Sequence, residues 1–208
     1  MVRRCSSVRR VVACASLAML SACETTPPLP TPEGPPEQAW RLRQQTLANF
    51  DTWFCAGRVG VNDGKEAFSA SLRWQQNRDS YDIRLSGPLG QGVAQVTGTP
   101  EGVALRTSDR EGTLVAPTAE ALIEQSLGWP LPVSGLRFWI LGITMPDTPV
   151  VSREIDRWGR LVRLEQSGWR IRYTEYARVD GVDLPSKMEL EHAPFSARIA
   201  VNRWEPGS

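Results

Sequence analysis

The sequence has very few of the residues on which metal sites and acid–base catalysis depend. Histidine occurs once in 208 residues, as His192, which argues against a histidine-rich metal site and most histidine-based catalysis. The Gly-x-Ser-x-Gly motif that carries the nucleophile of many lipases and esterases is also absent. His192 lies in a Glu-His-Ala-Pro turn, where we expect a solvated side chain. We therefore predict that the protein is not an enzyme, with no catalytic residue, no metal and no cofactor.

The N-terminal apolar run is too short to cross a membrane. Val11–Leu20 follows a basic segment, and ten residues do not span a bilayer of about 30 Å as a helix. Small residues and then Cys23 come next. This order is typical of a secretory signal, which we place at residues 1–22. The tetrad Leu20-Ser21-Ala22-Cys23 resembles the bacterial lipobox, which implies lipid attachment at Cys23; an ordinary signal peptide followed by a chance cysteine is the alternative.

Cysteine is correspondingly scarce in the mature chain. Cys5 and Cys14 leave with the signal and Cys23 is consumed by lipid, so only Cys55 remains and no internal disulfide can form. We expect Cys55 to be a small buried hydrophobic residue, because no acid–base motif surrounds it. The residue after Cys23 is Glu24 rather than aspartate, which in the usual sorting pattern points to a lipid-anchored, periplasm-facing protein of the outer membrane.

An excess of basic residues is also lacking once the signal is removed. The signal holds four arginines and no acid, so the rest has 20 basic and 23 acidic residues, a net charge of −3. Nucleic-acid binding requires a clustered basic face, and from this charge balance we expect no nucleic-acid binding. Six prolines between positions 27 and 36 predict an extended tether over residues 23–36. The folded domain is predicted to cover residues 37–208.

Alternating apolar residues organise the stretch from Phe68 to Gly92. Leu72 and Trp74 alternate with polar residues, and after a polar turn Ile83 does the same, which predicts two strands with one apolar face. The turn Gly87-Pro88-Leu89-Gly90 follows. Turns are normally polar, so Leu89 breaks the local rule.

The remaining pattern predicts short strands joined mostly by tight turns, with a few helices. Predicted strands lie at 54–62, 92–97, 103–107, 113–115, 150–155, 161–166, 169–176, 187–191 and 197–204. Predicted helices cover 37–50, 118–127 with Thr118 as N-cap, and 135–141 with Ser134 as N-cap. The fold class is therefore mainly β: an open, incomplete antiparallel barrel of about 10–11 strands, with helices covering its concave side. The pattern alone does not decide between a solid core and a hydrophobic cavity.

Several short motifs, in order and behind the lipobox, give this chain a family resemblance. They are Gly57-Arg58, Ser71-Leu72-Arg73-Trp74-Gln75, Pro88-Leu89-Gly90, Gly128-Trp129-Pro130-Leu131-Pro132, Leu136-Arg137-Phe138-Trp139-Ile140-Leu141-Gly142, Gln166-Ser167-Gly168-Trp169, Leu184-Pro185-Ser186-Lys187-Met188 and Asn202-Arg203-Trp204. The chain resembles the LolB family of outer-membrane lipoprotein receptors. Ile143-Thr144 departs from the family, in which we expect a proline.

The resemblance implies an unclosed barrel whose hydrophobic cavity binds the acyl chains of lipoproteins. The family takes these cargo proteins from a soluble periplasmic carrier (LolA-like) and inserts them into the lipids of the outer membrane, without nucleotide or metal, and we expect a monomer. Leu89 matches the exposed leucine that the family needs for insertion. We expect the cavity lining to include Leu72, Trp74, Ile83, Trp139, Ile171 and Met188.

Other interpretations remain open for each of these residues. Leu89 can fold back onto the domain as a packing residue, and each cavity residue can belong to an ordinary core. A non-transporting envelope lipoprotein, serving as a structural or protein-docking module, is the alternative function. A lipid hydrolase is disfavoured by the missing motif around serine.

Overall fold

The computed structural model describes residues 34–88, 92–108, 111–127 and 132–207. These residues belong to one compact unit, residues 32–208. The predicted signal, Cys23, most of the rest of the predicted tether, and Leu89 all lie outside the described residues. The unit has its own hydrophobic core, described below, so we expect it to fold without the residues that precede it.

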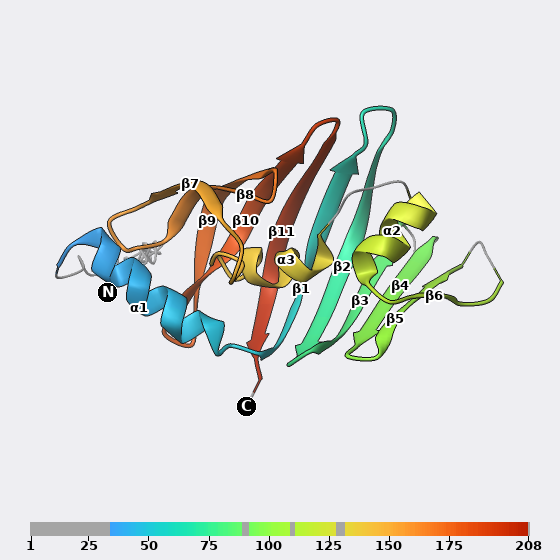
Figure 1. Cartoon of the computed structure of the whole chain (residues 1–208), viewed down its shortest axis with the longest axis horizontal. Helices are drawn as coiled ribbons and strands as arrows, with labels where there is room; N and C mark the ends of the chain where they lie inside the picture. Colours follow the sequence, from blue (N-terminus) through green and yellow to red (C-terminus); the bar gives the residue numbers. More distant parts are fainter. Residues whose placement is uncertain (1–33, 89–91, 109–110, 128–131, 208) are drawn as a thin grey trace, which may run out of the picture. The chain divides into compact units, whose positions relative to one another are not determined.

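The described residues form one large antiparallel sheet and three helices (Figure 1). The helices are α1 (Pro36–Ala48), α2 (Ala119–Leu127) and α3 (Val133–Trp139). The strands are β1 (Thr52–Asn62), β2 (Ala67–Asn77), β3 (Ser80–Ser86), β4 (Val93–Thr99), β5 (Gly102–Thr107), β6 (Leu114–Ala116), β7 (Val150–Ile155), β8 (Leu161–Gln166), β9 (Trp169–Val179), β10 (Val182–His192) and β11 (Phe195–Pro206). The prediction of an open antiparallel sheet of about 10–11 strands is confirmed.

The first and last strands pair in the middle of the sheet. The strand order is β6-β5-β4-β3-β2-β1-β11-β10-β9-β8-β7, and each strand is antiparallel to its neighbours. The sheet is thus two meanders joined along β1 and β11, with β6 and β7 as its two edges. Because the edges do not pair with each other, the sheet curls without closing.

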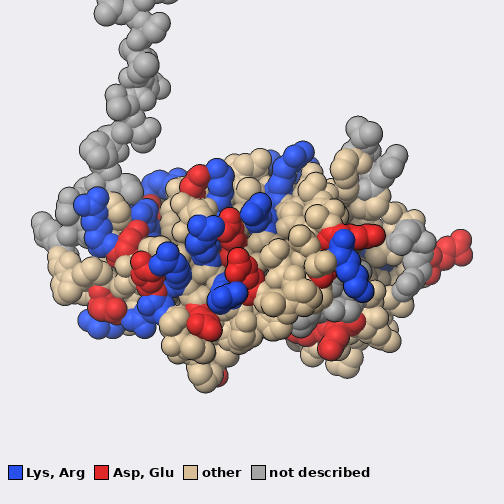
Figure 2. Space-filling model, turned by 90° about the horizontal axis from the view of Figure 1, so that it is seen from above, with Lys and Arg blue, Asp and Glu red and all other residues tan. Residues whose placement is uncertain are grey.

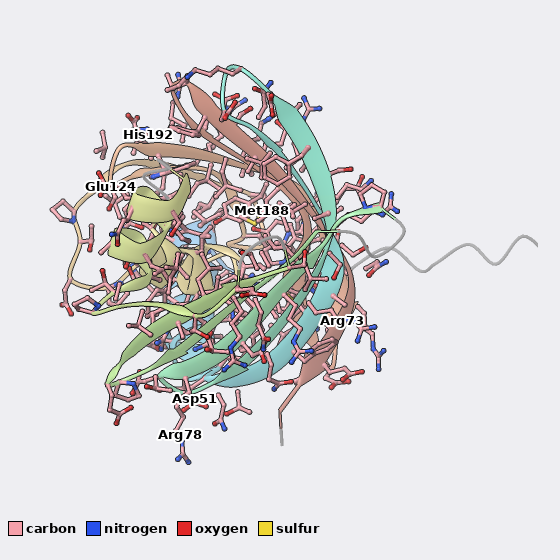
Figure 3. The ribbon with its side chains drawn as sticks, turned by 90° about the vertical axis from the view of Figure 1, so that its right-hand side faces the viewer. Asp51, Arg73, Arg78, Glu124, Met188 and His192 are labelled. Atoms are coloured by element: carbon pink, nitrogen blue, oxygen red, sulfur yellow. The ribbon has the colours of Figure 1, made fainter. Side chains whose placement is uncertain are left out.

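The helices lie on the concave side of the sheet. Figure 1 shows α2 and α3 in front of the strands, and Figure 3, from the side, shows α2 within the curve of the sheet. Helix α1 contacts β7 and buries Trp40 and Leu47. It is fixed to the end of α3 by Arg43, whose guanidinium donates to the carbonyl oxygen of Leu141 at 3.0 Å. Its Gln44 also donates to the hydroxyl of Thr144 at 2.7 Å.

Period-two burial along the strands builds the core. In β2, Leu72 and Trp74 are buried while Ser71 and Arg73 are exposed, as the alternation predicts. The larger apolar cluster fills the space between β1–β2, β8–β11 and α3, and a smaller one packs α2 against β5. Cys55 is fully buried in the larger cluster, and burial raises the pKa of its thiol, so the expectation of a buried, unreactive residue is met.

Two local predictions need correction. Thr118 does accept a hydrogen bond from the Ala121 N–H at 3.2 Å, but Ser134 is not the N-cap of α3. That helix begins at Val133, after Pro132, because the proline ring already fixes the backbone at the helix entrance. His192 is half-buried rather than solvated, because its ring lies against the indole of Trp169 with centroids 5.2 Å apart.

Candidate functional site: a hydrophobic cavity on the concave face

A cavity of about 120 Å³ lies between the concave face of the sheet and helices α2 and α3. Sixteen residues line it, and all but one are apolar. They are Val59, Val61, Leu72, Trp74, Ile83, Leu85, Val96, Ile123, Val133, Leu136, Trp169, Leu190, Phe195, Ser196, Ala197 and Ile199. No lining side chain carries a charge, so the cavity offers dispersion contacts and no ion pair to an occupant.

Strand register brings the lining residues onto one face. Val59 in β1 pairs with Ile199 in β11, and Trp74 in β2 pairs with Ile83 in β3. Because directly paired residues point to the same side of a sheet, apolar positions from four strands of the two meanders form one continuous surface. The helices then supply the opposite wall through Ile123, Val133 and Leu136.

The structure divides the six predicted cavity residues into two groups. Leu72, Trp74 and Ile83 line the cavity. Trp139, Ile171 and Met188 do not; they are buried in the larger apolar cluster.

Helix α3 explains this division, because its C-terminal end fills the other part of the concave face. The indole N–H of Trp139 donates to the side chain of Gln166 in β8 at 2.9 Å. The carbonyl oxygen of Trp139 accepts from the hydroxyl of Tyr173 in β9 at 2.9 Å. Trp139 and the strands beneath it are therefore packed solid, and the cavity is confined to the part beside them.

Several lining residues were missed by the sequence prediction. Val59, Val61, Leu85, Val96 and Leu190 alternate with other residues along their strands just as Leu72 and Trp74 do. The signal for an inward-facing side chain was thus present. The alternation does not indicate where α3 lies across the sheet. The position of α3 decides which inward-facing residues line the cavity.

The indole of Trp74 is held in place by a buried glutamine. Its N–H donates to Oε1 of Gln76 at 3.0 Å, and Gln76 donates in turn to the carbonyl oxygen of Arg78 at 2.7 Å. Gln76 is 1% exposed. Because the polar edge of Trp74 is satisfied within the wall, its apolar ring surface is presented to the cavity.

The two helices over the cavity are linked to each other. Oε1 of Glu120 in α2 accepts from the backbone N–H of Ser134 at 2.8 Å and from its hydroxyl at 2.6 Å. The carboxylate therefore takes the place of the cap that Pro132 does not provide. Arg137 of α3 also pairs with Asp79 in the β2–β3 turn at 3.4 Å. Helices α2 and α3 thus share a connection besides the chain between them.

Tyr81 lies near this link. Burial, with a smaller contribution from the charge of Glu120, raises the pKa of Tyr81 to about 12. Its ring packs directly on the backbone of β4, because a Cβ placed on Gly98 would sit 2.2 Å from the ring.

In the described part of the chain, no three His, Cys, Asp or Glu side chains come together as a candidate metal site.

Comparison with known proteins identifies the family. The family model described as outer membrane lipoprotein LolB matches residues 51–204. The chain belongs to the LolB family. It is 42% identical over 194 residues to the outer-membrane lipoprotein LolB of Nitrosococcus oceani, covering 92% of this chain and 94% of that protein. It is 39% identical over 201 residues to LolB of Pseudomonas aeruginosa, covering 96% and 97%.

Solved structures show the same fold at low sequence identity. A LolA superfamily protein from Nitrosomonas europaea aligns with a TM-score of 0.54 at 9% identity, covering 84% of this chain and 94% of that one. A putative outer-membrane lipoprotein-sorting protein domain from Vibrio parahaemolyticus aligns with a TM-score of 0.52 at 8% identity, covering 82% and 90%. The curled sheet with helices on one side is therefore shared with these proteins.

Membership of the LolB family establishes the location and the general role of the chain. It is a lipid-anchored protein of the outer membrane and serves as a receptor in lipoprotein localisation. The LolB family is a family of lipoprotein-trafficking receptors that receive lipoproteins from the LolA carrier. No helix among the described residues is long and apolar enough to cross a membrane.

Proposed function

We propose that the cavity binds the acyl chains of lipoproteins delivered by the periplasmic carrier, and that the receptor then releases them into the outer membrane. The observation that supports this proposal is the apolar cavity beneath α2 and α3, to which Leu72, Trp74 and Ile83 contribute. In this proposal the receptor acts as a monomer and carries out no chemical step. Cys23 carries the lipid anchor, and residues 23–36 form the tether.

The energetics of acyl chains require a receptor with an uncharged interior. Exposing a chain of about sixteen carbons to water costs about 12 kcal/mol at about 0.8 kcal/mol per CH₂, so release into water is slow. Handover works only if apolar surface is offered without interruption. Binding by dispersion and burial needs no directional bonds, so one cavity serves many different cargo proteins.

The cavity as described is too small for a whole acyl chain. Its volume of about 120 Å³ is similar to that of engineered cavities of about 150 Å³, which hold a molecule of the size of benzene. A bound chain therefore displaces α2 and α3 from the sheet. Direction without ATP follows if the receptor binds the chains more tightly than the carrier does.

A variant that fills the cavity tests this binding role. Ile83→Trp places a larger ring against Trp74, and we expect about tenfold weaker displacement of an apolar fluorophore by lipoprotein, because roughly 1.4 kcal/mol of burial is lost. The matched control is Val115→Trp, at a position that is 74% exposed on β6. Unchanged displacement in a folded Ile83→Trp protein would show that the cavity is not the acyl-chain site.

We further propose that Leu89 acts in release rather than uptake. The described ends of its loop are close together, because the N–H of Gly87 donates to the carbonyl oxygen of Gly92 at 3.2 Å. A leucine between these ends is unusual for a turn. The variant Leu89→Glu is expected to accept cargo from the carrier normally but to lose incorporation into liposomes. Normal results in both assays would contradict the role.

A non-transporting structural or docking module is the remaining alternative. It predicts stable binding to peptidoglycan or an assembly partner with no affinity for acyl chains. Depletion of the protein in its native cell separates the two: accumulation of carrier–lipoprotein complexes in the periplasm supports the receptor, and their absence supports the module.

A further inference from the structure

Four arginines lie on the convex face of the sheet, on the side opposite to the cavity. We call Arg58 of β1, Arg73 of β2, Arg84 of β3 and Arg106 of β5 the arginine patch; all four are exposed. Arg73 pairs directly with Arg84, and Arg84 and Arg106 both pair with Gln95 of β4. Arg58 pairs with Ser71, two positions before Arg73. Figure 3 shows Arg73 pointing outward, away from α2.

The patch contains far more positive than negative charge. Strands β1 to β5 hold these four arginines, no lysine and a single acidic residue, Asp82. Asp82 pairs with Arg84 at 3.3 Å, and Arg106 donates to the hydroxyl of Thr113 at 3.1 Å. Within the described ranges, Arg58 and Arg73 form no ion pair. Like charges placed directly opposite each other on a sheet, as in Arg73 and Arg84, are destabilising.

The other half of the same sheet is organised differently. On β8 to β11, most exposed cations are paired across strands with acids: Arg163 with Glu154, Arg170 with Glu191, Arg172 with Glu189, Arg178 with Asp183, Lys187 with Glu175 and Arg198 with Glu189. Arg203 pairs with Glu205 on its own strand. Figure 2 shows acidic and basic side chains intermixed on the β7–β10 side. A face that serves only solubility needs no more than such a mixture. The positive charge of the arginine patch, which nearby acids do not neutralise, therefore favours binding of an anionic partner.

We propose that the arginine patch binds the anionic phospholipid headgroups of the membrane that holds the lipid anchor. A guanidinium binds phosphate oxygens in a bidentate manner. Neighbouring strands are about 4.8 Å apart, so the five strands from β1 to β5 spread the patch over about 19 Å, enough for several headgroups. The convex face then contacts the headgroup layer of the bilayer.

The tether supports this choice of partner. The proposal rests on Cys23 as the anchored residue, which stands thirteen positions before α1 at Pro36. An extended chain of that length spans at most about 45 Å. The folded unit therefore never leaves the neighbourhood of the bilayer, and the membrane is its partner at the highest effective concentration.

Vesicle binding by residues 34–208, which lack the anchor, tests the proposal. The vesicles are phosphatidylethanolamine with or without one quarter of phosphatidylglycerol, and the bound fraction is measured by sedimentation. For Arg58→Gln/Arg73→Gln we expect binding to the anionic vesicles to weaken about 25-fold, since each basic residue near an anionic surface contributes about fivefold. Binding should also fall as salt rises, and Arg58→Lys/Arg73→Lys should keep most of it.

The matched control is Arg41→Gln/Arg157→Gln, which changes the net charge equally at two exposed positions on α1 and in the β7–β8 turn. This control is expected to bind like the wild type. Equal losses in both double variants, or binding that does not depend on phosphatidylglycerol, would overturn the proposal. So would a patch variant that binds vesicles normally but takes up less cargo from the carrier, because the patch would then serve a protein. Fluorophore displacement from the cavity reports separately on the acyl-chain site.

Discussion

Gln166 is the clearest case in which a single buried polar side chain decides how the site is built. It has no exposed surface. Its Oε1 accepts from the Trp139 indole and from the Met145 N–H, both at 2.9 Å, and its Nε2 donates to the carbonyl oxygens of Met145 and Thr148. One side chain thus joins β8 to the end of α3 and to the loop after it. It stabilises the packed part of the concave face, beside which the cavity remains.

Replacing this side chain by an apolar one should destabilise the protein strongly. In Gln166→Leu, one buried and three partly buried partner groups lose their hydrogen bonds, at about 1–3 kcal/mol for each buried group left unsatisfied. Because water re-enters part of the site, we expect about 3 kcal/mol in total. The measurement is urea unfolding against Gln45→Leu, an exposed position on α1, which should change stability by less than about 0.5 kcal/mol. Similar losses in both variants would contradict this role.

Residue by residue, the sequence predicts orientation better than contact. The alternation in β2 correctly places Leu72 and Trp74 inside and Arg73 outside. It also places Gln166 inside, in line with Leu164, but period-two patterns carry no information on which partners satisfy a buried amide. The surroundings of His192 were predicted wrongly for the same reason. Its contact with Trp169 joins two neighbouring strands, β10 and β9.

At the scale of elements, strand β1 occupies the most demanding position. It pairs with β2 on one side and β11 on the other, and its ladder with β11 shifts register between Ala56 and Gly57. At Gly57 the backbone of β11 comes very close: an added Cβ would lie 1.9 Å from the carbonyl oxygen of Ala200. A glycine is required there because no side chain fits.

Adding one methyl group at this position should therefore disrupt the sheet. For Gly57→Ala we expect a loss of more than about 3 kcal/mol or failure to fold, because backbone atoms of β11 must move. Gly60→Ala on the same strand is the control, since the nearest atom to its added Cβ is 3.9 Å away. That variant should be neutral or slightly stabilising in urea unfolding. If the Gly57 variant were as stable as the Gly60 variant, the close approach would be wrong.

Predictions of helix and strand bounds succeed where the residues that fix an element are its sequence neighbours. They fail where a residue distant in sequence fixes it. Thr118 before α2 was predicted correctly from the residues around it. Helix α3 was shifted, because its first turn is capped by Glu120 from another helix. The pairing of β1 with β11 joins residues 134 to 153 positions apart, from Asn62↔Ser196 to Trp53↔Pro206, and no local pattern in either strand predicts it.

For the whole molecule, burial of the tyrosines lowers stability at alkaline pH, in addition to the effect of the buried Cys55 thiol. The chain has three tyrosines, and all have raised pKa values. Burial raises the pKa of Tyr81 to about 12, and burial raises the pKa values of Tyr173 and Tyr176 as well. The hydroxyls of the last two donate to the carbonyl oxygens of Trp139 and Leu161. Their protonated forms are therefore part of the fold.

The sign of the pH dependence follows from these directions. Below about pH 10 every tyrosine is neutral in both states and its contribution to stability is complete. Above that pH the unfolded chain ionises first, so the free energy of unfolding falls by up to about 1.4 kcal/mol per pH unit for each of Tyr173 and Tyr176. Tyr81 adds less, because it is partly exposed. Phenolate absorbance should thus appear together with loss of circular dichroism; phenolate formed in the folded protein near pH 10 would contradict this.

Fold class is the level at which the sequence was most informative. Short alternating strands and tight turns predict an antiparallel sheet, and an apolar face on many strands predicts that it curls. The arrangement of helices over the concave face decides between solid packing and a cavity, and that arrangement depends on contacts such as those of Gln166 that no local pattern encodes.

The central pairing of β1 with β11 also has a consequence for biogenesis. Strand β11 follows the other ten strands along the described chain. While the chain is being exported, β1 can pair with β2 on one side but has no partner on its other side until β11 has emerged. The periplasm therefore receives a polypeptide whose sheet stays open in its middle until β11 arrives, and a chain that lacks β11 leaves one side of β1 unpaired.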